Sequence, residues 1–233
     1  MDGNGRWAEV HGLSRAEGHR RGADTVEKIV RDARDLGIEF LTLYAFSTEN
    51  WRRPKSEVLT LMRYLSEFLN TRERQMLSDG VRLLAIGQIS RLPSSVQKSL
   101  ARVIKNTSSC NQITLVLALS YGGRDEIVRA IAHVASLVSK RKLKIKAITE
   151  SKLQEFLDTR GIPDPDIIIR TAGEQRLSNF LLWQSAYAEF YYTPVLWPDF
   201  DREDLISAVA EYQRRERRYG GLSKRESQSI TPP

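Results

Sequence analysis

Residues that bind anions are concentrated in the first seven positions, Met1 to Trp7. This segment holds one carboxylate (Asp2), one guanidinium (Arg6) and two glycines on either side of an asparagine. Glycines let backbone amides approach a phosphate closely, an arginine neutralises it, and a carboxylate can hold a divalent cation against it. A helical pattern begins about ten residues further on, so the segment resembles a phosphate-binding loop before a helix. The competing interpretation is a frayed, solvated chain end.

Further polar side chains follow predicted strands, in the turns at 47–53, 121–124 and 171–176. Because the carboxyl ends of parallel strands meet at one edge of a sheet, we expect these turns to form one site. Several arginines there could bind two diphosphate-sized anions, and Asp2 with Glu189 could bring in Mg2+, which prefers oxygen ligands shared with phosphates. The candidates are the arginines Arg6, Arg15, Arg53, Arg170 and Arg176, the hydroxyls Ser47 and Ser178, and the carboxylates Asp2, Glu49, Glu174 and Glu189.

The elements that must position these residues follow from apolar periodicity. A spacing of three and four predicts helices at 18–36, from Pro54 through Leu69, after Pro93, at 127–137, at 151–157 and at about 202–217. Short apolar runs predict strands at 40–46, 81–86, 113–119, 166–170 and 190–192. Alternating strands and helices predict a single α/β domain with a mostly parallel central sheet flanked by helices.

Composition limits the function classes. The chain has 233 residues and a net charge of +7, which favours an anionic partner such as nucleic acid, phosphate esters or a membrane surface. The single cysteine, Cys110, excludes an internal disulfide framework and a cysteine-based zinc site. The sequence lacks an apolar run of membrane-spanning length and a signal peptide, so we expect a cytoplasmic protein, peripheral at most to the inner membrane face. The basic run from Lys140 to Lys146 is interpreted as a solvated connector that could touch anionic lipid.

Several common active-site motifs are missing. The sequence has no phosphate-binding loop of the Gly-x-x-x-x-Gly-Lys-Ser/Thr type, no Gly-x-Gly-x-x-Gly after a strand and no serine nucleophile elbow. The three histidines, His11, His19 and His133, are scattered along the chain.

Taken together, the polar motifs resemble the cis-prenyltransferase family in order and spacing, from Met1 to about Leu222. The similarity is carried by Met1-Asp2-Gly3-Asn4-Gly5-Arg6-Trp7-Ala8, Gly18-His19, Ala45 to Pro54, Tyr121-Gly122-Gly123-Arg124, Arg170 to Phe180 and Glu189-Phe190. The family condenses isopentenyl diphosphate onto an allylic diphosphate, usually farnesyl diphosphate, with cis stereochemistry and with Mg2+. Undecaprenyl diphosphate synthases of bacteria, which make the lipid carrier precursor for peptidoglycan, are the most similar branch.

The resemblance assigns roles to individual residues. It implies that Asp2 is the Mg2+-binding catalytic aspartate, that Glu189 is a second metal-linked carboxylate, and that Asn50 helps to remove a proton from isopentenyl diphosphate. The residues expected around the allylic diphosphate are Gly3, Asn4, Gly5, Arg6, Trp7, Arg15 and His19. Those expected beside Asn50 are Ser47, Thr48, Glu49, Trp51 and Arg53, and those expected at the isopentenyl diphosphate are Arg170, Arg176, Leu177 and Ser178.

The resemblance also implies a homodimer and a hydrophobic product tunnel. Arg218-Tyr219-Gly220 matches an element that reaches the neighbouring subunit's site. The strand around Ala45 and the helix with Leu61, Leu65 and Leu69 could line a tunnel, and transient membrane contact would serve product release. We expect residues 1–222 to form the catalytic domain and residues 223–233 to be a polar, disordered tail.

A hydrophobic strand usually precedes the Met-Asp-Gly-Asn motif in this family, and the printed sequence does not contain it. We expect its absence to leave neighbouring strands unpaired and Asp2 on a loose end, and we hypothesise that a fuller form begins upstream. Three alternatives remain open: a shorter or longer product, a non-catalytic partner subunit, and nucleic-acid binding. The last is disfavoured because no aromatic residues are interleaved with the basic ones.

Overall fold

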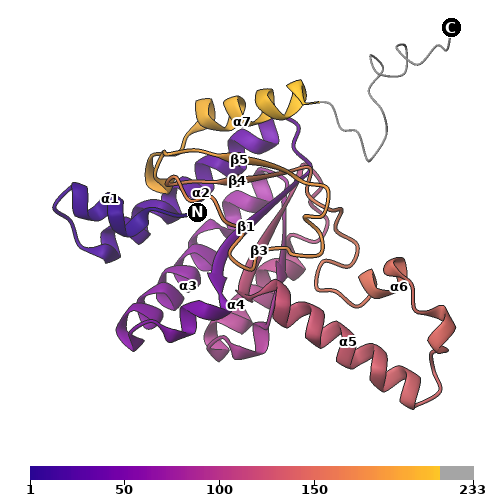
Figure 1. Cartoon of the computed structure of the whole chain (residues 1–233). Helices are drawn as coiled ribbons and strands as arrows, with labels where there is room; N and C mark the ends of the chain where they lie inside the picture. The colour runs from indigo at the N-terminus through magenta and orange to yellow at the C-terminus, as the bar shows by residue number, and fades with distance from the viewer. Residues whose placement is uncertain (216–233) are drawn as a thin grey trace, which may run out of the picture.

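The computed structural model describes residues 1–215. The helices are α1 (Asn4–Val10), α2 (Arg15–Asp35), α3 (Lys55–Ser78), α4 (Ser94–Asn106), α5 (Gly123–Ser139), α6 (Glu150–Gln154) and α7 (Arg202–Arg214). The strands are β1 (Phe40–Ser47), β2 (Val81–Ile86), β3 (Ile113–Tyr121), β4 (Ile167–Arg170) and β5 (Glu189–Tyr192). This arrangement confirms the predicted α/β class with parallel strands flanked by helices, as Figure 1 shows.

The strands form two parallel sheets rather than the single sheet expected. The larger sheet has the order β1-β3-β2, and β4 pairs with β5 alone. Within the described residues β1 therefore has a hydrogen-bonded neighbour on one side only, and so does β4. The cavity described below is lined by consecutive residues of both strands, so it lies between their free edges. The sequence predicted strands without a neighbour on one side, and among the described residues β1 and β4 each have such a free edge.

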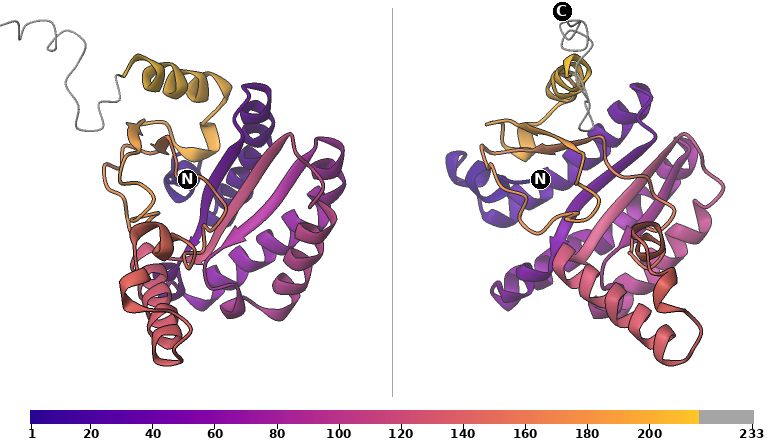
Figure 2. Two further views of the ribbon diagram at one scale, coloured as in Figure 1. Left: turned by 90° about the vertical axis from the view of Figure 1, so that its right-hand side faces the viewer. Right: turned by 45° about the vertical axis from the view of Figure 1, so that its right-hand side comes forward.

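The larger sheet is buried on both faces, with β3 at its centre. Alternate residues of β3 point to opposite sides, as a period of two requires. Leu115, Leu117 and Leu119 belong to the main core with helices α2 to α4, whereas Val116 and Ala118 pack with Leu181 in a smaller core. Figure 2 shows helices α3 and α4 on one side of this sheet and the chain that follows α6 on the other. The sheet is thus a rigid support for the polar turns at its carboxyl edge.

The N-terminal segment differs from the prediction, because it is helical from Asn4 instead of forming a loop. Gly3 adopts a left-handed conformation with φ of 108° just before this seven-residue helix. Only Ala8 of α1 is buried, so the sequence offers no apolar periodicity by which to detect it. The next helix also starts earlier than predicted, at Arg15, because Ser14 and Glu17 form a capping box.

The predicted end of the last helix at residue 217, the Arg218-Tyr219-Gly220 element and the tail at 223–233 lie outside the described residues. Among the residues that the structure describes, no helix is both long enough and apolar enough to cross a bilayer.

Candidate active site

Asp2 is firmly held, contrary to the expectation that it lies on a loose end. Its backbone N–H donates to Thr171 Oγ1 at 2.8 Å, and the Thr171 hydroxyl donates back to the Asp2 carbonyl at 2.9 Å. The Trp197 N–H donates to the same carbonyl at 2.9 Å. Thr171 follows β4 directly, so the end of β4 fixes the position of the Asp2 carboxylate. Sequence reasoning placed Thr171 in a polar turn but did not recognise it as the anchor.

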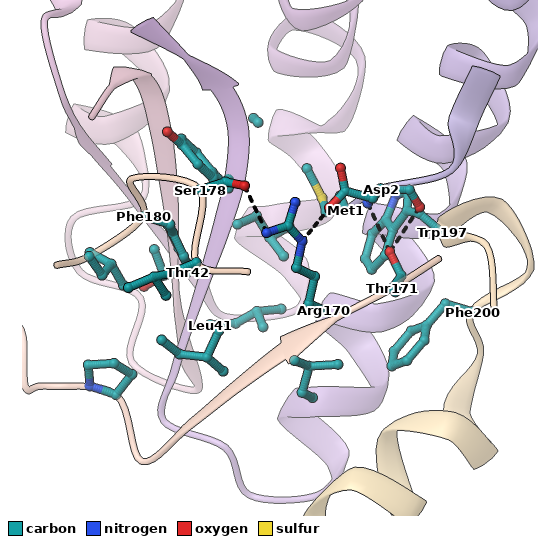
Figure 3. A pocket seen from close by; sticks show the side chains of 18 of the residues that line it. Met1, Asp2, Leu41, Thr42, Arg170, Thr171, Ser178, Phe180, Trp197 and Phe200 are labelled. Carbon is teal, nitrogen blue, oxygen red and sulfur yellow. Dashed lines mark hydrogen bonds and ion pairs between the residues drawn. The ribbon is translucent and has the colours of Figure 1, made fainter. Parts of the chain in front are cut away.

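Arg170 connects Asp2 with the second predicted binding segment. Its Nε donates to Asp2 Oδ2 at 2.9 Å, and its Nη1 donates to Ser178 Oγ at 2.8 Å, as Figure 3 shows. The Arg170 side chain is 13% exposed, whereas that of Asp2 is 42% exposed. The guanidinium is therefore fixed at the wall of the cavity, while the carboxylate remains open to a ligand.

Helices α1 and α2 touch at two glycines of α2. A Cβ on Gly18 would lie 2.1 Å from the Asn4 carbonyl oxygen, and one on Gly22 would lie 2.3 Å from Asn4 Oδ1. Glycine is required at both positions because any side chain would push α1 away. This close approach sets the Asp2-to-Arg6 segment against the start of α2, where Arg15 places its guanidinium over Gly5.

His19 is half-buried at the wall of the same cavity. Its Nε2 has no hydrogen-bond partner in the described part of the chain, and it lies 3.8 Å from Glu57 Oε1. Burial lowers the pKa of the imidazole, the positive charge of Arg53 lowers it further, and Glu57 opposes the shift. The lowered pKa favours the neutral imidazole, and its unpaired Nε2 is covered by protein in this structure.

Glu174 joins two of the predicted anion-binding arginines. Arg6 donates to Glu174 Oε1 at 2.9 Å and to the Ala172 carbonyl at 3.0 Å, and Arg176 forms an ion pair with the other Glu174 oxygen. The side chains of Arg6 and Arg176 are 50% and 64% exposed, so their remaining N–H groups can reach a ligand. The family resemblance assigns these arginines to two different diphosphates, and in the structure they share one carboxylate.

The turn after β1 fixes Asn50 by its side-chain oxygen. The Ser47 N–H donates to Asn50 Oδ1 at 3.0 Å and closes the 3-10 helix Thr48–Arg52. Asn50 also lines the cavity, and an oxygen that already accepts a hydrogen bond is a weaker proton acceptor. The structure therefore supports the turn-forming role that any loop asparagine can take.

The segment that carries Ser178 is held in a strained conformation. Ser178 and Asn179 both have positive φ values, 50° and 64°, which non-glycine residues seldom adopt. Three hydrogen bonds of Asn179 offset this strain. Its carbonyl accepts from the Gly123 N–H at 2.7 Å, its Oδ1 accepts from the Arg124 N–H at 2.8 Å, and its Nδ2 donates to Glu49 at 2.9 Å. Asn179 was not predicted as a site residue, although it links the turns at 47–53 and 121–124 to the segment that carries Ser178.

The turns enclose one cavity of about 1300 Å³. Most of the predicted residues line it: Asp2, Gly3, Asn4, Gly5, Arg6, Arg15, His19, Ser47, Glu49, Asn50, Arg53, Arg170, Arg176, Leu177 and Ser178. Its apolar part is lined by β1, including Ala45, together with β4 and residues from α7. Of the predicted tunnel residues on α3, Leu61 lines the cavity, whereas Leu69 is completely buried in the core.

Three predicted substrate contacts do not line this cavity. Trp7 donates from its indole N–H to Asp199 at 2.7 Å, and Trp51 donates from its indole N–H to Ser120 at 2.9 Å. Thr48 donates its hydroxyl to Glu49 at 3.2 Å. Each of these side chains supports neighbouring structure.

The structure does not bring Glu189 to Asp2 within one chain. Glu189 begins β5 opposite Ile167, whereas Asp2 is bound at Arg170, three residues along β4, which is about 10 Å at the usual rise of a strand. Glu189 accepts a hydrogen bond from Arg215 at 2.7 Å instead.

The donors at Asp2 fit Mg2+ only when phosphate oxygens complete the coordination shell. No cluster of three or more His, Cys, Asp or Glu side chains that could hold a metal occurs among the described residues. One carboxylate oxygen of Asp2 carries no hydrogen bond to the described residues, while the other accepts from Arg170, and Arg6 and Arg15 line the same cavity. Mg2+ is commonly bound in this way, through one or two carboxylates and the substrate's phosphates.

The fold and site define a parallel α/β protein whose cavity combines anion-binding arginines with an apolar wall. The whole of residues 1–220 matches the family model described as "Putative undecaprenyl diphosphate synthase", and the chain therefore belongs to this family of cis-prenyltransferases. An isoprenyl transferase of Clostridium perfringens is 50% identical over 95% of this chain and 88% of its own length.

Two other relatives differ in the specificity that their names state. The ditrans,polycis-undecaprenyl-diphosphate synthase of Micrococcus luteus, specific for (2E,6E)-farnesyl diphosphate, is 46% identical over 95% of this chain and 89% of its own. The structure of lavandulyl diphosphate synthase from Lavandula x intermedia, in complex with dimethylallyl diphosphate, has a TM-score of 0.91 and 38% identity, covering 94% and 95% of the two chains.

Proposed function

We propose that this enzyme condenses isopentenyl diphosphate onto an allylic diphosphate, with farnesyl diphosphate as the allylic substrate, and forms a cis-polyprenyl diphosphate. The single observation that carries the proposal is the cavity itself, in which a cluster of arginines at Asp2 continues into an apolar space between β1 and β4. A diphosphate attached to a growing hydrocarbon has the same two parts. By analogy with the Micrococcus luteus relative, the product is the undecaprenyl lipid carrier precursor for cell-wall synthesis.

The first chemical task is departure of the allylic diphosphate. Arg6, Arg15 and the backbone amides after Gly3 bind the leaving group, and their fixed positive charges stabilise the negative charge that develops on it. Asp2 would hold Mg2+ against the same oxygens, and the ion supplies further charge neutralisation there. His19 stays neutral and donates a hydrogen bond, because burial disfavours its protonation.

The second task is to hold isopentenyl diphosphate and remove one proton. Arg170, Arg176 and Ser178 bind its diphosphate, and Leu177 packs against its apolar part. We assign the proton to a diphosphate oxygen rather than to Asn50, because Asn50 Oδ1 already accepts the Ser47 N–H. Asn50 then orients the substrate through its NH2 group, with Ser47, Glu49 and Arg53 beside it.

The proposal is tested by incubating the purified protein with farnesyl diphosphate, labelled isopentenyl diphosphate and Mg2+. We expect a butanol-extractable labelled product whose chromatographic position among polyprenol standards gives its length. Absence of any labelled product with this and with shorter allylic diphosphates would contradict the proposal and favour a non-catalytic partner subunit.

A second candidate product class follows from the similarity to lavandulyl diphosphate synthase. On this alternative the chain would use dimethylallyl diphosphate and make a short product. The large apolar part of the cavity favours the longer chain, and the same assay with dimethylallyl diphosphate decides between the two.

We further propose that the active form is a homodimer. Val128 and Ile131 of α5 are 64% and 53% exposed and lie on one face of the helix, which leaves an apolar surface that a second copy would cover. Light scattering during size-exclusion chromatography should give twice the chain mass of 26.6 kDa at micromolar concentration. A monomer that is fully active at that concentration would contradict the dimer.

A further inference from the structure

A strongly basic surface lies at the carboxyl end of α5, remote from the cavity. It consists of residues 140–148, called the basic corner here, with the sequence Lys-Arg-Lys-Leu-Lys-Ile-Lys-Ala-Ile. Figure 1 shows that this part of the chain projects from the body of the molecule at the far end of α5. No residue of the basic corner lines the cavity.

The basic corner carries five positive charges without a compensating negative one. The side chains of Lys140, Arg141, Lys142, Lys144 and Lys146 are exposed, and none forms an ion pair with the residues that the structure describes. A helix carboxyl end attracts cations through its dipole, which accounts for Lys140 and Arg141. It does not account for Lys144 and Lys146, which lie beyond the last turn of α5.

Apolar side chains are exposed among these charges. Ile145 is 72% exposed and Ile148 is 41% exposed. The backbone around them is ordered by turns, with the Ala147 N–H donating to the Lys144 carbonyl at 2.9 Å and the Ile148 N–H to the Ile145 carbonyl at 3.0 Å. The two isoleucines are therefore held on a folded surface, where exposing their apolar side chains to water is unfavourable. The like charges around them also repel each other.

We propose that the basic corner is a docking surface for an anionic lipid membrane. Clustered lysines attract anionic headgroups, and isolated aliphatic side chains between them insert at the boundary with the acyl chains. Single-stranded nucleic acid fits less well as the partner. Proteins that bind it stack the bases on aromatic side chains, and the basic corner has no aromatic residue. The purpose of docking rests on the proposed function, because a long polyprenyl diphosphate must leave the cavity into lipid.

The test is flotation of the full chain with lipid vesicles, without substrates, so that its outcome does not depend on prenyl transfer. Vesicles of pure phosphatidylcholine are compared with vesicles that also contain phosphatidylglycerol. We expect binding to the anionic vesicles only, with release as added salt screens the charges.

The corner variant Lys142→Gln/Lys144→Gln/Lys146→Gln should lower the partition coefficient by on the order of 100-fold, from the usual effect of each cation near a charged surface. The matched control variant is Arg82→Gln/Lys98→Gln/Lys105→Gln, which removes the same charge from three exposed cations on other elements. The control should bind as the unaltered protein does. In Ile145→Ser, which keeps every charge, binding should fall several-fold.

Equal loss of vesicle binding in both triple variants would overturn the proposal, because binding would then follow overall charge. Unchanged binding in the corner variant would also overturn it. A third contradicting outcome is failure to bind anionic vesicles, combined with binding of a labelled single-stranded oligonucleotide that the corner variant loses. Unaltered thermal unfolding of the variants checks that they are folded, since all the substituted side chains are exposed.

Discussion

At the scale of single residues, the site depends on how other residues restrict a few side chains. Asp2 is held through its backbone and has a carboxylate oxygen left for a cation, whereas Asn50 is held through the very oxygen that would accept a proton. Of these two residues from different motifs, Asp2 keeps a side-chain oxygen without a hydrogen bond to the described residues, whereas the side-chain oxygen of Asn50 already accepts one.

We predict that Asp2→Ala lowers turnover by about 10²- to 10³-fold, the usual effect of losing one group that stabilises transition-state charge. The backbone hydrogen bonds to Thr171 and Trp197 remain, so the free energy of unfolding should fall by no more than about 1–2 kcal/mol. Steady-state kinetics and denaturant unfolding measure the two effects. Asp24→Ala, which removes another partly exposed carboxylate, is the control and should change neither. Equal losses of activity and stability in Asp2→Ala would indicate a structural role.

The half-buried His19 predicts a pH dependence of stability. Its pKa is lowered in the folded protein, so the unfolded chain binds a proton more readily. Above the ordinary histidine pKa, His19 is neutral in both the folded and the unfolded chain and does not affect stability. As the pH falls below that value, the unfolded chain takes up a proton first, so the free energy of unfolding should decrease. Chemical unfolding between about pH 5 and 8 in the unaltered protein and in His19→Gln measures this contribution. The change of the free energy of unfolding with pH should be smaller in the variant. An identical pH dependence in both proteins would show that His19 is not responsible.

At the scale of elements, the position of α1 is decided by its contact with α2. The glycines of α2 allow the Asn4 carbonyl to approach the helix axis, so the diphosphate-binding segment depends on residues of another helix. A helix as short as α1 has little stability of its own and needs such a contact.

Gly18→Ala tests this contact. Alanine in a helix interior normally stabilises by about 1 kcal/mol relative to glycine. Here its Cβ would lie 2.1 Å from the Asn4 carbonyl oxygen, so we expect a net loss of about 1–3 kcal/mol, as for other overpacked sites. Thermal or urea unfolding measures the change, and Arg20→Ala on the exposed face of α2 is the control. A stabilised Gly18→Ala variant would mean that α1 can move away without cost.

At the scale of the whole molecule, the cavity joins the two sheets. The free edges of β1 and β4 form its walls, and the polar turns close one end of it. Each isoprene unit adds five carbons, whose burial contributes roughly 4 kcal/mol at about 0.8 kcal/mol per carbon. Binding of the growing chain therefore improves with each unit only while apolar wall remains uncovered, and we predict that the free volume limits product length.

Ala45→Phe should shorten the product, because Ala45 lines the cavity on β1 and a larger ring there would occupy space needed by the chain. We expect the first condensations to continue at rates within a few-fold of the unaltered enzyme. Chromatography of labelled products measures the length distribution. Ala101→Phe, on the exposed side of α4, is the control for a new aromatic side chain. An unchanged distribution in Ala45→Phe would place the growing chain elsewhere.

The sequence alone determined the class of fold and named residues that the structure brings to one cavity. Helix and strand periodicities depend on residues two to four positions apart, and the predicted strands agree with β1 to β5 within two residues at each end. Most of the residues predicted from the polar motifs line the cavity, whereas its apolar lining, mainly β1 and β4, was largely not predicted. The short α1 was missed because only one of its residues is buried.

Only the tertiary structure decided how these residues are arranged. The separation of β4 and β5 from the larger sheet, the anchoring of Asp2 by Thr171 and the distance of Glu189 from Asp2 all depend on contacts between distant parts of the chain. The hydrogen bond between Asp2 and Thr171 joins residues 169 positions apart. Local sequence patterns carry no information about such pairs, because residues this far apart in the sequence come into contact only in the folded chain.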